Sequence, residues 1–208
     1  MIVPSAWSLV IAVTLIIVTT VSLRLLYVIS PNARRPPVKN KDQPSHLVVV
    51  LGSGGHTAEM ISLLRDVNTT RWRRRTYIIS AGDHFSSTKA QDCEERIQSK
   101  HRPSMPCTKP GELDSTTGVW DTIVVPRARE IHQPLYTAPI SSFWCMLACL
   151  KALHQTSVTS TLHQQYPDAI ITNGPATAVI VILATFLLKF LGLAPSWTGQ
   201  TDQATKQQ

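Results

Sequence analysis

Residues 48–60 read VVVLGSGGHTAEM, and this stretch decides the fold. A β-branched run ends at Gly-Ser-Gly-Gly, a sequence that keeps side chains away from the backbone where a strand turns into a helix. Beyond the glycines, apolar residues recur with the i, i+3, i+4, i+7 spacing of one helix face: Met60, Leu63, Leu64 and Val67. Strand, glycine turn and amphipathic helix predict the first half of a βαβ unit.

The same alternation of apolar runs and helical patterns continues along the chain. We expect strands at 46–51, 75–80, 122–126 and 169–172, and helices near 60–67, 90–99, 142–154 and 176–191. Repeated βα units predict an α/β fold, a Rossmann-like parallel sheet with helices on its faces. The last helix is apolar, but only about 13 residues precede Lys189, which favours a buried core helix over a second membrane span.

The glycine loop is the first candidate binding site, and it consists of Gly52, Ser53, Gly54, Gly55 and His56. A loop of this kind exposes backbone N–H groups at a helix N-terminus, where the helix dipole favours a phosphate or diphosphate group. His56 could donate a hydrogen bond to that anion or move a proton. A glycine turn selected only for tight strand-to-helix packing is the alternative. The spacing fits neither the G-x-G-x-x-G dinucleotide motif nor the Walker A motif.

Two further turns follow predicted strands. Arg127 and Arg129 come after the third strand, and Asn173 and Gly174 come after the fourth. Because the carboxyl ends of parallel strands meet at one edge of a sheet, we expect these residues to line the same crevice or to face a partner. The arginines could clamp a phosphate or pair with carboxylates. The alternatives are a solvated charge pair and a turn that only ends a strand.

The N-terminal segment predicts a membrane anchor. Residues 7–28 contain one charge, Arg24, and a helix of about 22 residues is about 33 Å long, close to the ~30 Å of a hydrocarbon core. No basic residue precedes this run, which disfavours a cleaved signal peptide. Basic residues follow it, so the positive-inside rule places the rest of the chain in the cytosol. We therefore divide the chain into a transmembrane anchor (1–29), a basic Pro-rich linker (30–45), a Rossmann-like domain (46–193) and a polar tail (194–208).

The amino-acid composition limits the kinds of ligand and site that the chain is expected to have. Its 208 residues are 43% hydrophobic and carry a formal net charge of +7, a balance that suits nucleic acid, anionic lipid or phosphate-bearing ligands. Part of this charge is a group of four arginines at 71 and 73–75. The four cysteines lack the spacing of a zinc site, so no metal is expected. Cys145 and Cys149, one helical turn apart in an apolar stretch, are expected to be buried thiols.

Four segments behind the predicted anchor carry a family resemblance: LGSGGHTAEM (51–60), YIISAGDHFS (77–86), VPRAREIHQ (125–133) and TNGPATA (172–178). Together they resemble the membrane-anchoring subunit of the UDP-N-acetylglucosamine transferase of dolichol-linked oligosaccharide synthesis, the asparagine-linked glycosylation protein fourteen family. The resemblance covers roughly residues 5–193. It implies the acceptor-side half of a two-chain GT-B glycosyltransferase, held by a single transmembrane helix on the cytosolic face of the endoplasmic reticulum, with the nuclear envelope as a second location.

The family resemblance also implies a reaction and a partner. A soluble catalytic subunit would bind UDP-GlcNAc, and the complex would add the second N-acetylglucosamine to a dolichol-diphosphate-linked acceptor on the way to protein N-glycosylation. This chain alone is then expected to bind no cofactor, no metal and no nucleic acid, and to be inactive. The glycine loop from Gly52 to His56 would face the acceptor diphosphate, with His56 orienting or deprotonating the acceptor sugar. Glu59 would be either a second functional group or a surface carboxylate.

Two departures from the family pattern affect these expectations. The family has a glycine where this chain has Ala176, which we expect to matter little. The family also continues with strand and helix segments that dock the catalytic subunit, where this chain has a divergent tail from residue 194. Two other functions therefore stay open. One is a membrane-tethered adaptor without sugar transfer, such as a truncated member of the family. The other is a complete single-chain lipid-linked glycosyltransferase, which the chain length disfavours.

Overall fold

The computed structural model of the chain describes residues 6–30, 45–101, 107–130, 133–158 and 166–194. The chain divides into two compact units, residues 39–187 and residues 1–38 together with 188–208. Nearly all of the predicted linker and tail lies outside the described residues, so both remain predictions.

The predicted anchor is a continuous helix, α1 (Ala6–Ile29). It is the one helix among the described residues that is long and apolar enough to cross a membrane. Arg24 near its end donates from Nε to the carbonyl oxygen of Phe190 at 2.8 Å, a contact inside one compact unit. A guanidinium at the end of a helix satisfies carbonyl groups that have no partner within the helix.

Four parallel strands form the sheet: β1 (His46–Leu51), β2 (Arg74–Ser80), β3 (Val119–Val125) and β4 (Ala169–Asn173). Their order is β3-β2-β1-β4, and Val49 of the central strand is in register with Tyr77 on one side and Ile171 on the other. Every residue of β1 is buried, as expected for a central strand covered on both faces. The predicted α/β fold with a parallel sheet is confirmed.

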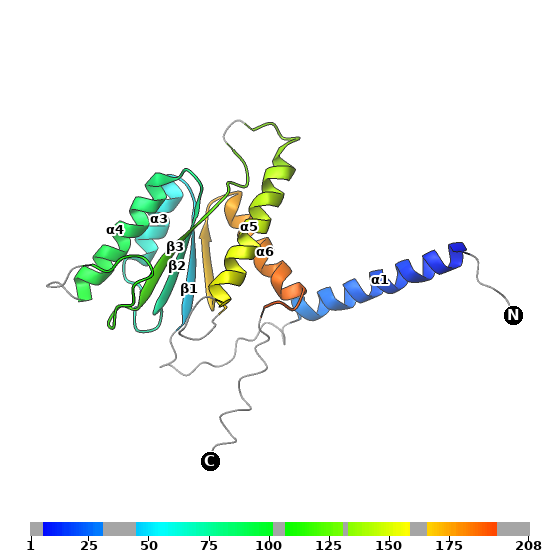
Figure 1. Ribbon diagram of the computed structural model, residues 1–208, viewed down its shortest axis with the longest axis horizontal. Coiled ribbons are helices and arrows are strands. Elements are labelled where there is room, and N and C mark those ends of the chain that lie inside the picture. The colour runs from blue at the N-terminus through cyan, green and yellow to red at the C-terminus, as the bar shows by residue number, and fades with distance from the viewer. Residues whose placement is uncertain (1–5, 31–44, 102–106, 131–132, 159–165, 195–208) are drawn as a thin grey trace, which may run out of the picture. The chain divides into compact units, whose positions relative to one another are not determined.

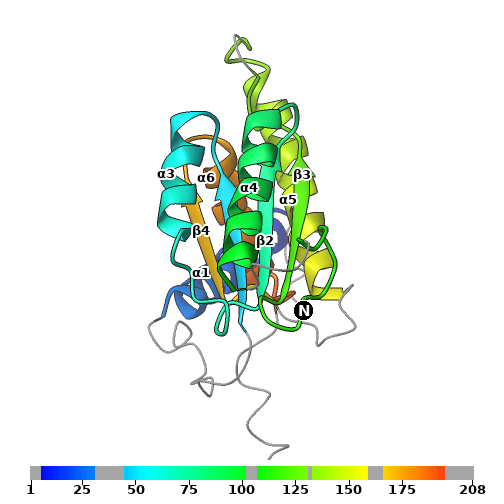
Figure 2. The same cartoon turned by 90° about the vertical axis from the view of Figure 1, so that its left-hand side faces the viewer.

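Two helical layers cover the sheet. Helices α3 (Gly55–Leu64) and α4 (His84–His101) lie on one face, and α5 (Ala138–Val158) and α6 (Thr177–Phe190) lie on the other (Figure 1). The view turned by 90° shows the same division, with α3 and α4 in front of the sheet and α5 and α6 behind it (Figure 2). The prediction for α6 is right for one side of this helix only. Val181 and Ala184 are fully buried, but Ile182 and Leu183 are exposed.

The main hydrophobic core lies between the sheet and the α3–α4 layer. It is built from alternate residues of the strands, such as Leu47, Val49 and Tyr77, and from the inner faces of the two helices. The rings of Tyr77 and Trp120 meet edge to face with centroids 6.4 Å apart, a favourable aromatic geometry.

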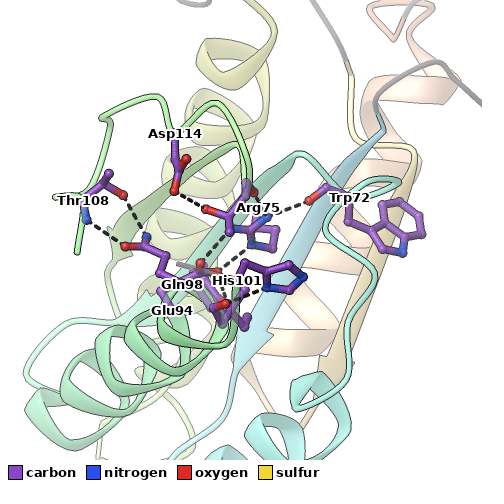
Figure 3. Close-up of polar contacts among 10 residues, drawn as sticks. Trp72, Arg75, Glu94, Gln98, His101, Thr108 and Asp114 are labelled. Carbon is purple, nitrogen blue, oxygen red and sulfur yellow. Dashed lines mark hydrogen bonds and ion pairs between the residues drawn. The ribbon is translucent and has the colours of Figure 1, made fainter. Parts of the chain in front are cut away.

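A buried ion pair joins β2 to α4, and no sequence motif indicated it. Arg75 belongs to the group of four arginines, but its side chain is fully buried and donates two 2.7 Å hydrogen bonds to the carboxylate of Glu94 (Figure 3). It also donates to the carbonyl oxygens of Trp72 and Thr117. Burial lowers the pKa of Arg75, but the hydrogen bond and ion pair with Glu94 offset this and raise it above its ordinary value. Burial and Glu94 raise the pKa of Tyr77, which donates to the same carboxylate.

The other face of the sheet has a different interior. Cys145 and Cys149 of α5 are fully buried there, which confirms the prediction of buried thiols. Asp121 of β3 is in register with Thr76, and one of its carboxylate oxygens, Oδ1, is buried without a hydrogen-bond partner among the described residues. Its other carboxylate oxygen, Oδ2, lies 4.0 Å from Nη2 of Arg74. Burial raises the pKa of Asp121, and the hydrogen bond with Thr76 and the charge of Arg74 oppose that rise.

Candidate functional site

A cavity of about 130 Å³ opens at the carboxyl edge of the sheet. Residues that follow β1, β2, β3 and β4 all contribute to its wall, together with the first turn of α6. Of the residues predicted from the sequence, Gly52, Ser53, Arg127, Arg129 and Asn173 line it. Ligands of open α/β sheets bind in the crevice outside the carboxyl ends of the strands. The cavity is therefore the candidate binding site of this unit.

Close backbone approach explains two of the glycines. A Cβ atom on Gly52 would lie 2.6 Å from the carbonyl oxygen of Asn173, and one on Gly174 would lie 3.2 Å from the Cα of Gly52. The turns after β1 and β4 thus touch through their glycines. For Gly52 the structure supports tight packing, the alternative raised from the sequence, because the atom that approaches is part of the protein.

The other two glycines of the loop have open space around them. A Cβ atom on Gly54 or Gly55 would meet no heavy atom within 4 Å. Gly54 has φ of +62°, a left-handed backbone conformation that glycine adopts without steric cost. Both glycines stand at the start of α3, where backbone N–H groups lack partners within the helix. A ligand could therefore come close to the backbone of Gly54 and Gly55, although these two residues do not line the cavity.

Buried hydroxyl groups fix the floor of the loop. The hydroxyl group of Thr57 donates to the Gly52 carbonyl and contacts the hydroxyl group of Ser86 at 2.6 Å. Asp83 caps the start of α4, because its carboxylate accepts hydrogen bonds from the Ser86 N–H (3.0 Å) and the Ser86 hydroxyl (2.7 Å). The negative charge of Asp83 at the cavity wall is thus partly satisfied by its own helix. This network joins the loop after β1 to the start of α4.

Two arginines supply the positive charge of the cavity. Arg127 donates from Nε to the carbonyl oxygen of Ala81 at 2.9 Å, so its position is set by the turn after β2. Arg129 is exposed and donates from Nη2 to the carbonyl oxygen of Gln133 at 3.2 Å. Both guanidinium groups keep further N–H donors for an anion. Two arginines on one wall suit a phosphate or diphosphate group.

The start of α6 forms the opposite wall. Thr177 and Ala178 of its first turn line the cavity, and the Thr177 hydroxyl contacts the Ser80 hydroxyl at 3.0 Å. The backbone dipole of α6 favours negative charge at this end. Ala176 precedes the helix with φ of +60°, a conformation that costs an alanine more than the glycine expected there from the family resemblance. Alanine in place of glycine at position 176 therefore costs more conformational energy than its one added methyl group suggests.

His56 does not line the cavity. Its ring Nδ1 lies 3.6 Å from Oε2 of Glu59, and the same oxygen accepts a 2.7 Å hydrogen bond from the amide of Asn173. Asn173 does line the cavity, so it joins the cavity wall to the His56–Glu59 pair. An imidazole beside a carboxylate can take a proton from a substrate or donate one to it. The pair is exposed, so a substrate could reach it from solvent.

Some wall residues were missed by sequence reasoning. Ser80, Asp83 and Thr177 line the cavity, although only their surrounding motifs had been noted. Their signal is their position at one edge of the sheet, because Ser80 ends β2, Asp83 caps the start of α4 and Thr177 begins α6. Among the described residues, no group of three or more His, Cys, Asp or Glu side chains is placed to hold a metal ion.

Comparison with known proteins adds independent information. Residues 47–200 match the family model described as "Oligosaccharide biosynthesis protein Alg14 like". The chain is similar to proteins named UDP-N-acetylglucosamine transferase subunit alg14 or ALG14. The one from Aspergillus fumigatus is 37% identical over 138 residues, which are 62% of this chain and 59% of that protein. The one from Cryptococcus neoformans is 30% identical over 177 residues, 85% of this chain and 71% of that protein.

A mouse protein of the same name is 27% identical over 149 residues, 71% of this chain and 58% of that protein. The chain thus spans less than two thirds of the length of the Aspergillus and mouse relatives. No solved structure matches the chain.

Proposed function

Since the chain belongs to the Alg14 family of oligosaccharide biosynthesis proteins, we propose that it is the membrane-anchoring, acceptor-binding subunit of a two-chain UDP-N-acetylglucosamine transferase. In this proposal the complex adds the second N-acetylglucosamine to the dolichol-diphosphate-linked acceptor. This chain recruits a soluble catalytic subunit, and that subunit binds the UDP-GlcNAc. The relatives' names support the sugar donor and the status of a subunit.

The observation that carries acceptor binding is the composition of the cavity. Two arginines from one loop, the first turn of α6 and the start of the glycine loop converge on a space of about 130 Å³. Backbone N–H groups at helix starts and bidentate guanidinium groups are the donors that proteins use for phosphate oxygens. In this proposal the acceptor diphosphate binds in this cavity and contacts Arg127, Arg129 and Thr177 of its wall.

His56 is assigned to the acceptor sugar instead of the diphosphate. It lies outside the cavity but is joined to it through Glu59 and Asn173. The acceptor sugar extends from the diphosphate, and its attacking hydroxyl must lose a proton during transfer. An imidazole in contact with a carboxylate is suited to accept that proton or to orient the hydroxyl. Gly54 and Gly55 leave room for the sugar beside His56.

The proposed membrane arrangement is supported by the length and apolar composition of α1. One apolar helix of 24 residues crosses the endoplasmic reticulum membrane, and the basic residues after it keep the α/β unit in the cytosol. Asn68-Thr69-Thr70 fits the N-glycosylation pattern, and Asn68 is exposed. In this orientation Asn68 stays unmodified, which the intact mass before and after glycosidase treatment measures. A glycan on Asn68 would reverse the orientation.

Transfer to a diphospho-polyprenol acceptor by the full chain in nanodiscs tests the proposal. We expect activity only when the soluble subunit and UDP-N-acetylglucosamine are both added. Replacing Arg129 by glutamine removes a charge-assisted hydrogen bond and should raise KM for the acceptor about tenfold while leaving KM for the donor unchanged. Arg96→Gln, an exposed arginine on α4, is the matched control and should change neither constant.

Three results of this assay would contradict the proposal. Binding of the soluble subunit without transfer would favour a membrane-tethered adaptor. Transfer by the chain alone would favour a complete enzyme. An unchanged acceptor KM in Arg129→Gln would move the diphosphate out of the cavity.

A further inference from the structure

The turn that follows β4 is joined to the His56–Glu59 pair by a side chain. Asn173 ends β4, and its amide nitrogen Nδ2 donates a 2.7 Å hydrogen bond to Oε2 of Glu59. The same carboxylate oxygen lies 3.6 Å from Nδ1 of His56. Asn173 and Glu59 are 114 positions apart in the sequence, so the pairing of β4 with β1 is what brings this amide to the pair.

The chemistry of Glu59 fixes the orientation of the Asn173 amide. An ionised carboxylate only accepts hydrogen bonds, so the nitrogen and not the oxygen of the amide must face it. The same nitrogen lies 3.4 Å from the carbonyl oxygen of His56, which is a second acceptor. One side chain therefore contacts both the backbone of His56 and the carboxylate beside its ring.

Gly174 lies at the other edge of the His56 ring. A Cβ atom on Gly174 would lie 3.7 Å from Cδ2 of that ring and 3.8 Å from Cβ of His56. Nδ1 and Cδ2 are the two ring atoms next to the point of attachment. With Glu59 beside one and Gly174 beside the other, the far end of the ring, which contains Nε2, is left for a ligand. The His56 side chain is 47% exposed, so a substrate can reach that end.

A surface ion pair one helical turn apart is the simpler explanation of His56 and Glu59. Such exposed pairs add little to stability and need no third group. Here a side chain from another element donates to the carboxylate, and that side chain, Asn173, also lines the cavity. The convergence of these groups beside the candidate binding site favours a functional arrangement.

We propose that Glu59 and the turn of Asn173 and Gly174 position His56 to accept a proton at Nε2. A carboxylate oxygen beside Nδ1 favours the tautomer with its hydrogen on Nδ1, which leaves the lone pair on Nε2. Asn173 holds that carboxylate from the cavity wall, and Gly174 leaves room for the ring. The 3.6 Å separation is longer than a hydrogen bond, and contacts of this kind commonly shorten when substrate binds.

The consequence for catalysis rests on the proposed function, whereas the tautomer rests on the geometry alone. In the transfer step the acceptor hydroxyl oxygen forms a bond to the anomeric carbon of the donor sugar. The bond from that carbon to UDP breaks, and its electron pair leaves with UDP. The hydroxyl proton passes to Nε2 of His56, and the negative charge of Glu59 stabilises the imidazolium that forms. Glu59 is thus a positioning residue that acts through His56.

Nitrogen-15 NMR tests the tautomer without a measurement of activity. The full chain, labelled at histidine and held in liposomes, is observed at about pH 8.5, where imidazoles are neutral. His56→Gln identifies the His56 signals by their loss. We expect the hydrogen on Nδ1 in the unsubstituted chain and a larger share on Nε2 in Glu59→Ala and Asn173→Ala. Glu95→Ala, at an exposed glutamate of α4, is the matched control and should change nothing.

Kinetics of transfer in nanodiscs, with the soluble subunit and UDP-N-acetylglucosamine, test the role in catalysis. Glu59 does not line the cavity, so Glu59→Ala should lower kcat about tenfold and leave the acceptor KM within about twofold. In a His56→Gln background the same substitution should cause no further loss, because Glu59 acts through the ring. Asn173→Ala should likewise cause no further loss of kcat once Glu59 is alanine. Circular dichroism checks the fold of each variant.

Three results would overturn the positioning role. The first is an unchanged tautomer of His56 in Glu59→Ala. The second is an equal loss of kcat with and without the His56 ring, which would mean that Glu59 acts independently of it. The third is a raised acceptor KM with unchanged kcat, which would make Glu59 a binding residue. A chain with the Nδ1–H tautomer but no transfer would contradict the proposed function while supporting the orientation of His56.

Discussion

The two helical layers of this α/β unit differ in the charged groups that they cover and in the side chains that they expose. The α3–α4 layer carries charged residues outside and encloses the fully buried ion pair of Arg75 and Glu94. The α5–α6 layer is apolar outside, and the carboxylate beneath it, Asp121, has a cation only at 4.0 Å. The difference teaches that one layer has the composition of a water-facing surface, whereas the other exposes a row of apolar side chains. The candidate cavity lies at the edge of the sheet where the two layers meet.

The largest expected effect comes from breaking the buried ion pair of Arg75 and Glu94 beneath the α3–α4 layer. Glu94→Gln leaves the Arg75 guanidinium buried without a counter-charge, and removing one partner of such a pair costs about 3–5 kcal/mol. Urea unfolding of the full chain in detergent, followed by far-ultraviolet circular dichroism, measures this loss in the free energy of unfolding. Glu95→Gln, one residue away and exposed, should change it by less than about 0.5 kcal/mol. Equal losses in the two variants would show that the pair is not buried.

The next effect separates the two sides of α6. Val181 is fully buried, whereas Val179 on the outer side of the helix is 60% exposed. Val181→Ala should lower the free energy of unfolding by about 2 kcal/mol through lost burial and a residual cavity. Val179→Ala, which is chemically the same change, should cost less than about 0.5 kcal/mol. If Val179→Ala is the more costly variant in the same unfolding experiment, the outer side of α6 is packed against protein.

A smaller effect concerns the turn that begins α6. Ala176 adopts φ of +60°, so Ala176→Gly should relieve strain and raise the free energy of unfolding by about 1 kcal/mol. Ala178→Gly, inside the regular helix two residues later, should lower it by about 1 kcal/mol, because there glycine adds only entropy loss. The opposite signs are the result to look for. Destabilisation in both variants would mean that residue 176 is not in the left-handed conformation.

The smallest effect concerns the carboxylate beneath the second layer. Because folding raises the pKa of Asp121 above 3.8, its charged form is disfavoured in the folded chain, and stability falls as pH rises through the interval between the two pKa values. Asp121→Asn should therefore raise the free energy of unfolding by about 0.5 kcal/mol at pH 7. The gain should vanish near pH 3.8. A loss at pH 7 would show instead that the contact with Arg74 is a stabilising ion pair.

The fold could be predicted from the sequence to a large extent. The four strands are β-branched or apolar runs between glycine and proline turns, and the helices between them have clear periodicity or length. The exposed outer side of α6 was not predicted, because a helix that is apolar all round does not reveal which side meets the sheet. The ion pair of Arg75 and Glu94 was not predicted, because the two residues lie 19 positions apart in the sequence and meet only once α4 packs on β2.

The candidate site was predictable in part. Glycine and arginine motifs indicated Gly52, Ser53, Arg127, Arg129 and Asn173, which line the cavity. Ser80 and Thr177 are single hydroxyl residues at strand and helix ends, and their type carries no signal without the sheet order. His56 belongs to the motif but does not line the cavity. It already lies in the first turn of α3, so the helix and not the glycine loop sets the direction of its side chain.

Binding of a short-chain polyprenyl diphosphate to the full chain in nanodiscs, followed by ³¹P NMR without the partner subunit, tests the central claim most directly. We predict saturable binding that Arg129→Gln weakens about tenfold and Arg96→Gln leaves unchanged. Binding that is equal in all three proteins, or an absence of saturable binding in the unsubstituted chain, would contradict the claim that this cavity holds the diphosphate.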